Sequence, residues 1–185
     1  MGNIVAVSCS PRENDTSSVV ADAFLDGAMG LSTNIITLHK LVKFMALLDC
    51  RRCMACKNTG KCRINDDLQQ VLADISNADC VVFATPIFLG SPVGLYKLLE
   101  DRMYSFLDKE GKSVLAPGKK AIIILTSYTE DEDLSGAAEI MSKNLAALGF
   151  ELMDVITSCD VREIDPALLH RAKELGRTLR NTPTV

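Results

Sequence analysis

The sequence is poor in the residue types that most often carry acid–base catalysis or membrane insertion. It has no tryptophan and only two histidines, His39 and His170. No stretch approaches the roughly 20 apolar residues that cross a bilayer, and the apolar run at 3–7 is too short for a signal peptide and lacks a basic leader. We therefore expect a cytoplasmic protein with no membrane partner. No Ser–His–Asp or Cys–His arrangement is evident, so we assign no catalytic side chain.

The chain also lacks an excess of basic charge. It has 20 lysines and arginines against 24 acidic residues, which gives a formal net charge of −4. Nucleic-acid binding depends on basic patches that neutralise phosphates, so we expect no nucleic-acid partner. The glycine-rich loops G-x-G-x-x-G and G-x-x-x-x-G-K-[ST] are absent as well, which argues against a dinucleotide site and a P-loop. A small anion held by a local group of residues remains compatible with this composition.

Five apolar runs alternate with helical patterns along the 185 residues. Strands apolar on both faces are typical of a parallel sheet covered on both sides, and right-handed crossovers then give a doubly wound α/β domain. The prediction is a flavodoxin-like three-layer sandwich with a five-stranded parallel sheet in the order 2-1-3-4-5. It forms a single domain over 1–185 with a cysteine-rich loop at 49–63. The predicted strands are 3–8, 34–38, 79–84, 119–127 and 150–158.

The loop after the first strand, SCSPRENDTSS at 8–18, combines several features that bind phosphate. Ligands of such sheets lie beyond the carboxyl ends of the strands. The hydroxyls of Ser10, Thr16 and Ser17 stand near the start of a helix, whose free N–H groups carry a partial positive charge. Arg12 adds a planar cation suited to phosphate. The pattern predicts a phosphate cradle; the alternative is an ordinary helix cap beside a solvated arginine.

Four of the seven cysteines lie in DCRRCMACKNTGKC at 49–62, with the spacing C-x2-C-x2-C-x5-C. The C-x2-C-x2-C run is typical of thiolates that hold a [4Fe–4S] cluster, whereas zinc usually draws on two separated pairs. A zinc site, a disulfide and a redox-sensing thiol pair remain alternatives. Because the segment follows the second strand, we expect it at the same edge of the sheet as the phosphate loop. The predicted cluster ligands are Cys50, Cys53, Cys56 and Cys62.

Two loops resemble those of the NADPH-dependent FMN reductase and flavodoxin-like group. SCSPRENDTSS is similar to the G-S-P-R-x-x-[GS]-x-T loop, which binds the FMN phosphate in that family. Residues 83–104 are similar to the segment G-S-P-V-Y-F-G-S-x-x-x-x-L-K-x-x-x-D-R, which wraps the flavin ring. The resemblance implies phosphate contacts from Ser10, Arg12, Asn14, Thr16 and Ser17. It implies ring contacts from Thr85, Pro86, Ile87, Phe88, Leu89 and Gly90.

A third loop, at 126–136, follows the fourth predicted strand. Its Tyr128 is a candidate to cover one face of a flavin, although a solvated acidic loop with carboxylates at 130–133 is an equal alternative. Carboxylates beside a bound phosphate repel a second phosphorylated ligand, so this loop favours a protein electron donor over NADPH. The alternative for the second loop is a packed turn whose Phe88 belongs to the core.

The cysteine motif, followed by Ile64, Asp66 and Asp67, makes the chain similar to the iron–sulfur flavoproteins over residues 3–105. These carry FMN and a [4Fe–4S] cluster in one small subunit. The resemblance implies an oxidoreductase that passes electrons between a carrier such as ferredoxin and an acceptor, as a homodimer or homotetramer. One alternative is an NAD(P)H-dependent FMN or quinone reductase without a cluster. Another is a metal-binding or thiol-sensing regulatory module.

Overall fold

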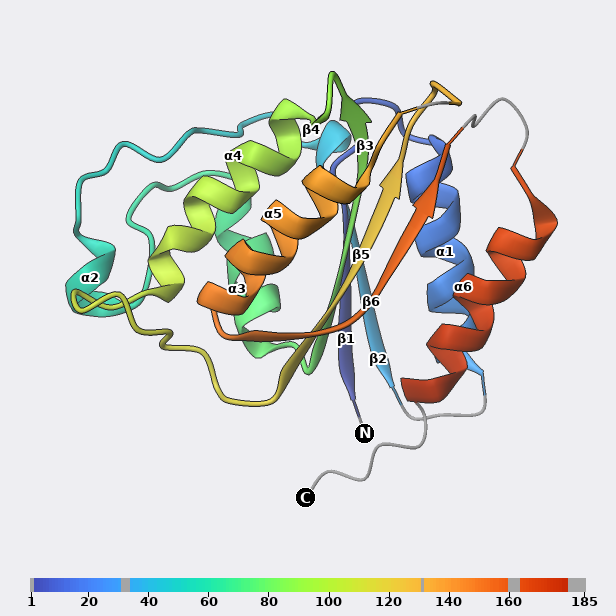
Figure 1. Cartoon of the computed structure of the whole chain (residues 1–185). Coiled ribbons are helices and arrows are strands. Elements are labelled where there is room, and N and C mark those ends of the chain that lie inside the picture. The colour runs from blue at the N-terminus through green and yellow to red at the C-terminus, as the bar shows by residue number, and fades with distance from the viewer. Residues whose placement is uncertain (1, 31–33, 131, 160–163, 180–185) are drawn as a thin grey trace.

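The computed structural model describes residues 2–30, 34–130, 132–159 and 164–179 (Figure 1). Five strands pair in parallel in the order β2-β1-β3-β5-β6, and the short β4 pairs antiparallel with the end of β3. With β4 set aside, this is the predicted order, and the flavodoxin-like fold is confirmed. The strands are β1 (Asn3–Ser8), β2 (Ile35–Lys40), β3 (Cys80–Phe88), β4 (Ser91–Pro92), β5 (Lys119–Thr126) and β6 (Phe150–Ser158).

Helices cover both faces of the sheet. α1 and α6 lie on one face, and α3, α4 and α5 lie on the other (Figure 1). α2 stands apart from the sheet at the outer end of the cysteine segment. None of the helices described here is long and apolar enough to span a membrane. The helices are α1 (Thr16–Met29), α2 (Cys56–Thr59), α3 (Leu68–Asn77), α4 (Gly94–Met103), α5 (Ser135–Ala147) and α6 (Pro166–Thr178), with 3₁₀ turns at Leu41–Lys43 and Tyr104–Phe106.

The two-faced burial of the strands follows from the alternation of side chains along them. In β1, Val5 and Val7 belong to the core under α3, α4 and α5, whereas Ile4 and Ala6 belong to the core under α1 and α6. All four side chains are buried. Because successive side chains point to opposite faces, a strand covered on both sides needs an unbroken apolar run. This is why the strands could be located from the sequence.

The segment after the third predicted strand differs from the prediction. Residues 85–92 were expected to form a loop, but β3 continues to Phe88 and the chain returns as β4. Leu89 and Gly90 form the turn between them with φ of 52° and 74°. Two successive left-handed residues fit the two-residue hairpin turn whose twist matches the strands. Leucine is rare in this conformation, which is why the hairpin was not recognised.

Two glycines let α1 and α6 approach closely. A Cβ at Gly27 would lie 2.0 Å from the carbonyl oxygen of Lys173, and a Cβ at Gly176 would lie 2.1 Å from that of Phe24. Both obstacles are backbone atoms, which cannot move aside as a flexible side chain does. The contact between these helices therefore depends on the absence of a side chain at both positions.

We expect Gly27→Ala to lower the free energy of unfolding by roughly 1–3 kcal/mol, since overpacking forces the helices apart. Urea denaturation measures this. Gly136→Ala is the matched control, because a Cβ there, in the first turn of α5, meets no atom within 4 Å. Equal midpoints for the two variants would contradict the close packing of α1 on α6.

Candidate functional site

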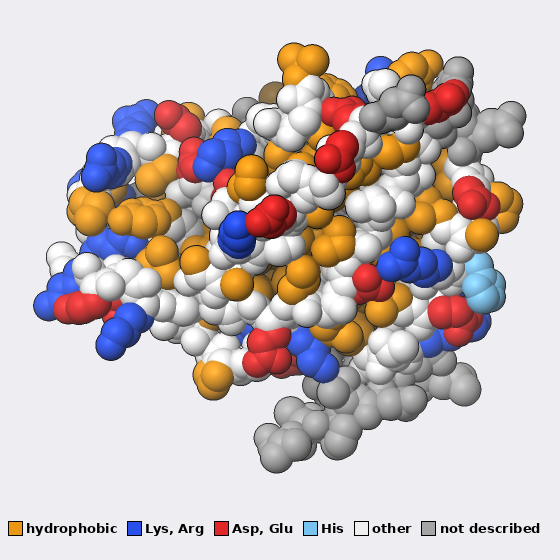
Figure 2. Space-filling model, in the orientation of Figure 1, with side chains coloured by type: hydrophobic (Ala, Val, Ile, Leu, Met, Phe, Trp, Pro, Cys, Tyr) orange, Lys and Arg blue, Asp and Glu red, His pale blue; other side chains and the backbone are white. Residues whose placement is uncertain are grey.

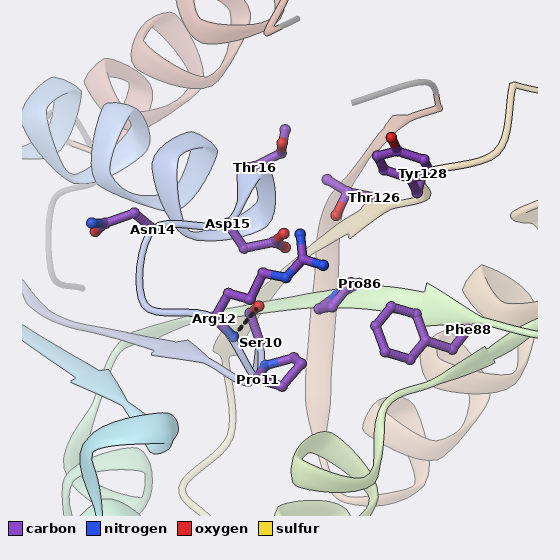
Figure 3. A pocket seen from close by; sticks show the side chains of 10 residues that line it. All are labelled: Ser10, Pro11, Arg12, Asn14, Asp15, Thr16, Pro86, Phe88, Thr126 and Tyr128. Atoms are coloured by element: carbon purple, nitrogen blue, oxygen red, sulfur yellow. Dashed lines mark hydrogen bonds between the residues drawn. The ribbon is translucent and has the colours of Figure 1, made fainter. Parts of the chain in front are cut away.

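A pocket of about 220 Å³ lies where β1, β3 and β5 end (Figure 3). Parallel strands place their carboxyl ends at one edge, so loops far apart in sequence meet there. The pocket brings together residues predicted from all three loops. Its lining consists of Ser10, Pro11, Arg12, Asn14, Asp15, Thr16, Pro86, Phe88, Thr126 and Tyr128.

Five of the predicted cofactor contacts do not line this pocket. Ser17, Thr85 and Ile87 are buried and contribute no surface to it. The Leu89 side chain projects from the hairpin and is fully exposed. The backbone N–H of Gly90 donates to the Glu132 carboxylate over 2.8 Å.

The first loop is held in a defined shape beside the start of α1. The N–H of Arg12 donates to the Ser10 hydroxyl over 3.0 Å, and the Ser17 hydroxyl donates to the Asp15 carboxylate over 3.1 Å. The N–H of Cys9 donates to the Ala84 carbonyl over 2.8 Å, which fastens the loop to β3. Asp15 is the N-cap residue but its side chain caps no N–H group. The start of α1 therefore keeps N–H groups that can donate hydrogen bonds to a bound anion.

Charged groups of both signs line the pocket. The guanidinium of Arg12 extends into it, and the Asp15 carboxylate lies on the same side (Figure 3). The cation and the helix N-terminus attract an anion, whereas the carboxylate opposes it. The arrangement suits an anion that approaches Arg12 and the first turn of α1.

Thr126 is a pocket residue that the sequence analysis missed. It lies at the end of β5, is 1% exposed, and lines the pocket. Its Oγ1 atom is buried and has no hydrogen-bond partner among the described residues. Buried polar atoms are nearly always paired, so this hydroxyl is a candidate ligand contact. The signal was available: Thr126 is the first polar side chain after the apolar run of β5.

Large apolar side chains flank the mouth of the pocket. Phe88 and Tyr128 both line it and are 56% and 66% exposed. They come from different strand ends and stand on the same side of the pocket (Figure 3). Exposed aromatic side chains at the rim of a polar pocket suit a ligand that combines an anionic end with a flat ring.

The cysteine segment leaves this edge of the sheet and runs along α4. Lys57 in α2 donates to the carbonyls of Tyr104 and Leu107 over 2.6 and 2.7 Å, at the C-terminal end of α4. Its ammonium also lies 3.5 Å from the centre of the Tyr104 ring. No residue of 49–63, a range that the structure describes throughout, lines the pocket. Contrary to the expectation, none of the four cysteines lines the pocket, because the segment runs along α4 and Lys57 bonds to the end of that helix.

The carboxylates of two acids before α3 bind the chain just ahead of the cysteine segment. The Asp67 carboxylate accepts from the N–H groups of Met45 and Ala46 over 2.9 and 3.0 Å. The Asp66 carboxylate accepts from the N–H of Leu48 over 2.8 Å. Asp67 is the N-cap residue of α3 but makes no side-chain capping bond. The acids that follow the cysteines therefore stabilise the chain that leads into the cysteine segment.

The four thiols have the right chemistry for a cluster but do not converge. Cys50, Cys56 and Cys62 are half-buried and Cys53 is exposed. No three His, Cys, Asp or Glu side chains in the described ranges come close enough to hold a metal ion. Burial raises the pKa of Cys56, Lys57 opposes this, and the thiols of Cys62 and Cys50 raise it further. Four thiols in one short segment suit an iron–sulfur cluster by type and number.

The fold and the pocket define a flavodoxin-like α/β protein with an anion-binding first loop and an aromatic rim. The model of the family described as NADPH-dependent FMN reductase matches residues 3–155. The chain therefore belongs to that family.

Curated relatives are named for two cofactors. An iron–sulfur flavoprotein of Methanocaldococcus jannaschii is 33% identical over 101 residues, which are 54% of this chain and 50% of that protein. An iron–sulfur flavoprotein of Clostridioides difficile is 26% identical over 148 residues, 80% of this chain and 63% of that protein. For the archaeal relatives, the match spans about half of their length.

Solved structures agree in fold. The apo form of an NADH:FMN oxidoreductase matches with a TM-score of 0.69 and 20% identity, covering 99% of this chain and 92% of that chain. An NAD(P)H:quinone oxidoreductase from Methanothermobacter marburgensis matches with a TM-score of 0.72 and 19% identity, covering 96% and 98%. Identities this low support the shared fold alone.

Two cysteines outside the motif, Cys9 and Cys80, are shielded from solvent. Cys9 and Cys80 are buried in the core. Burial raises the pKa of Cys9 far above its ordinary value and that of Cys80 to about 12. Both therefore stay neutral at pH 8, and the neutral thiol is a poor nucleophile.

In reduced, chelator-treated native protein at pH 8, we expect iodoacetamide to alkylate Cys53 and to leave Cys9 and Cys80 unmodified. Peptide mass spectrometry measures the extent at each cysteine. In urea all three should react, which is the control for intrinsic reactivity. Early labelling of Cys80 in the native protein would show that its strand is not buried as described.

Proposed function

We propose that the chain is an FMN-dependent oxidoreductase whose pocket at β1, β3 and β5 holds the flavin. The observation that carries this proposal is the pocket itself: it has a cation and a helix start at one end and exposed aromatic side chains at the other. The buried Thr126 hydroxyl also lines it and has no partner among the described residues. The FMN phosphate would lie at Ser10, Arg12 and Thr16. Family membership supports the choice of FMN among anionic ring-bearing ligands.

Different residues around the pocket would bind the phosphate and the ring of FMN. The volume of about 220 Å³ is below the roughly 300–1,000 Å³ of sites that enclose a whole ligand of this kind. The pocket therefore suits the phosphate end, and the ring would lie across the rim against Phe88 and Tyr128. Thr126 would donate its unpaired hydroxyl to the part between them. FMN supplies the redox chemistry, and the protein supplies position and electrostatics.

We propose further that Cys50, Cys53, Cys56 and Cys62 hold a [4Fe–4S] cluster and that the protein transfers electrons through it. The compact cysteine spacing and the names of the curated relatives support this. In the structure Cys56 already has Cys50 and Cys62 as electrostatic neighbours. The segment would have to close further to bring all four sulfurs to one centre.

The charge around the cysteines suits an acidic protein carrier such as ferredoxin. Lysine and arginine side chains gather at the end of the molecule that carries α2 (Figure 2). Such a basic surface offsets the negative charge of thiolates and attracts an acidic partner. The basic residues of the segment are Arg51, Arg52, Lys57, Lys61 and Arg63.

The distance between the two sites favours an oligomer. The pocket lies near the start of α4 and Lys57 contacts its far end, and a ten-residue helix is about 15 Å long. A homodimer or homotetramer would let the cysteine segment of one subunit approach the flavin of another. This part of the proposal rests on the separation of the sites and on the family resemblance.

A second candidate is an NAD(P)H-dependent FMN or quinone reductase without a cluster. The absence of a converged metal site among the described residues favours it, as does the family description. Glu132 bonds to Gly90 in the hairpin near the pocket mouth and so places a carboxylate close to where the phosphates of NADPH would approach. Because this carboxylate would repel NADPH, the contact favours the first candidate, in which a protein carrier such as ferredoxin supplies the electrons. A regulatory module without flavin would leave the pocket unexplained.

The chain purified without oxygen should carry one FMN and about four irons with matching acid-labile sulfide. Metal analysis and flavin release on denaturation measure this. Protein that carries FMN but neither iron nor sulfide would contradict the proposed cluster and favour the reductase. Such a reductase would reduce its acceptor with NADPH alone. Protein that holds zinc and releases no flavin would contradict both candidates.

Arg12→Ala should weaken FMN binding by roughly 10- to 100-fold, because a charge-assisted hydrogen bond contributes about 1.5–3 kcal/mol. Thr126→Val keeps the shape of the side chain and removes its hydroxyl, and it should weaken FMN binding less than Arg12→Ala does. Quenching of FMN fluorescence measures the dissociation constants. Arg171→Ala is the control, since Arg171 lies exposed on α6 and pairs with Asp154. Unchanged affinity in Arg12→Ala would place the phosphate elsewhere.

A further inference from the structure

The tip of the β3–β4 hairpin, which carries Phe88, is held by few bonds of its own. β3 pairs with β5 only as far as Pro86. Beyond that point the ladder with β4 has two residue pairs, Ile87 with Pro92 and Phe88 with Ser91. Proline has no N–H group to donate, so the first of these pairs cannot exchange two backbone bonds. The place of Phe88 at the pocket mouth therefore depends also on contacts from outside the hairpin.

The turn of this hairpin needs such a contact. Leu89 has a φ of 52°, in the left-handed region that leucine seldom adopts. A residue in such a conformation persists only where its surroundings hold it there. The Leu89 side chain is fully exposed, so its own packing does not do this. The next N–H group along the chain, that of Gly90, is the one that Glu132 binds.

The Glu132 carboxylate joins the hairpin to the third loop. One of its oxygens accepts from the N–H of Gly90 over 2.8 Å, and the other accepts from the Ser127 hydroxyl. Ser127 is 2% exposed, and its N–H donates to the Ser158 carbonyl over 2.9 Å at the end of β6. This carboxylate bridge thus connects the exposed tip of the hairpin to a buried residue at the edge of the sheet.

The backbone around Glu132 is fixed as well. Its N–H donates to the Thr129 carbonyl over 3.4 Å, and its carbonyl accepts from the Cys159 thiol over 3.3 Å. The N–H of Thr129 donates to the Ser127 hydroxyl over 3.1 Å, which closes the loop around Tyr128. The third loop is therefore a defined support from which the carboxylate reaches the hairpin.

The bridge sets the positions of the two rim aromatic side chains relative to each other. Phe88 precedes Gly90 by two residues, and Tyr128 follows Ser127 directly. Both rings line the pocket from the same side (Figure 3). With the bridge intact, hairpin and loop move as one unit and the two rings form one surface. A surface that is already ordered receives a flat ligand without the cost of ordering it.

We propose that Glu132 is the positioning residue for the flavin ring: its carboxylate fastens the hairpin to the third loop and keeps Phe88 and Tyr128 at the separation that receives the ring. This role rests on the proposed flavin site. It needs two hydrogen bonds rather than a charge, so an amide can replace the carboxylate. A glutamine accepts from Gly90 through its oxygen and donates to the Ser127 hydroxyl through its nitrogen.

The fluorescence of FMN bound at saturation to the full, chelator-treated chain tests this, because a tyrosine in contact with an excited flavin quenches it. Tyr128→Leu removes the quenching ring and sets the upper limit of the signal. Glu132→Ala should raise the fluorescence of bound FMN at least half-way to that limit. Arg12→Ala should weaken binding but leave the FMN that does bind fully quenched, since its contact is with the phosphate.

Glu132→Gln is the matched control, because it removes the charge and keeps the bridge. It should bind FMN that is as quenched as in the wild type. Glu139→Ala removes an exposed acid that pairs with Lys143 on α5 and should also match the wild type. A Glu132→Gln variant as bright as Glu132→Ala overturns the bridge. Quenching that survives in Glu132→Ala or in Tyr128→Leu overturns the proposal as well.

Ser127→Ala removes the other end of the bridge and provides the test should Glu132→Ala fail to fold. It should raise the fluorescence of bound FMN in the same direction. In the double variant the second substitution should add little, because both changes break the same bridge. Unchanged quenching in Ser127→Ala, or full additivity in the double variant, would contradict the role of Glu132.

The outcomes for the wild type and the variants separate this role from the proposed function. Wild-type protein that binds no FMN removes the proposed function and this role with it. Wild-type protein that binds FMN quenched by Tyr128, with no dependence on Glu132, keeps the function and removes the role.

Discussion

The parallel pairing of β1 with β3, and of β3 with β5, is the constraint on which the site depends. Ser8 pairs with Ala84, and Pro86 pairs with Thr126, so the three strand ends finish at the same edge. Residues more than a hundred positions apart in the sequence then line one pocket. Strands buried on both faces cannot slip in register without exposing apolar side chains, which keeps this edge in place.

The cysteine segment is held by side-chain bonds rather than by strand pairing. It has only one short helix of its own. Asp66, Asp67, Gln69 and Arg102 lie outside it and hold its ends, and its own Lys57 bonds to the chain after α4. A segment fixed by a few side-chain bonds keeps freedom between the anchors. That freedom is what the proposed metal site would need, and it accounts for an anchored Cys62 and an exposed Cys53 within thirteen residues.

Sequence periodicity revealed the sheet, the flanking helices and the strand order, because burial on both faces leaves an unbroken apolar run. It could not reveal the β3–β4 hairpin, since Leu89 occupies a conformation that leucine seldom adopts. The position of Thr126 after the apolar run of β5 was a usable signal, but its buried hydroxyl without a partner among the described residues is visible only in the structure. The course of the cysteine segment along α4 depends on long-range bonds such as that from Arg102 to Leu48, which no local pattern encodes.

The central claim is that one chain holds a flavin at the strand edge and a metal centre on the segment along α4. A crystal structure of protein purified and crystallised without oxygen, with its native cofactors, tests it most directly. The account predicts the FMN phosphate beside Arg12 and the start of α1, and iron bound by the sulfurs of Cys50, Cys53, Cys56 and Cys62. A flavin bound away from Arg12 and Thr126, or cysteines 50–62 free of metal in such crystals, would contradict it.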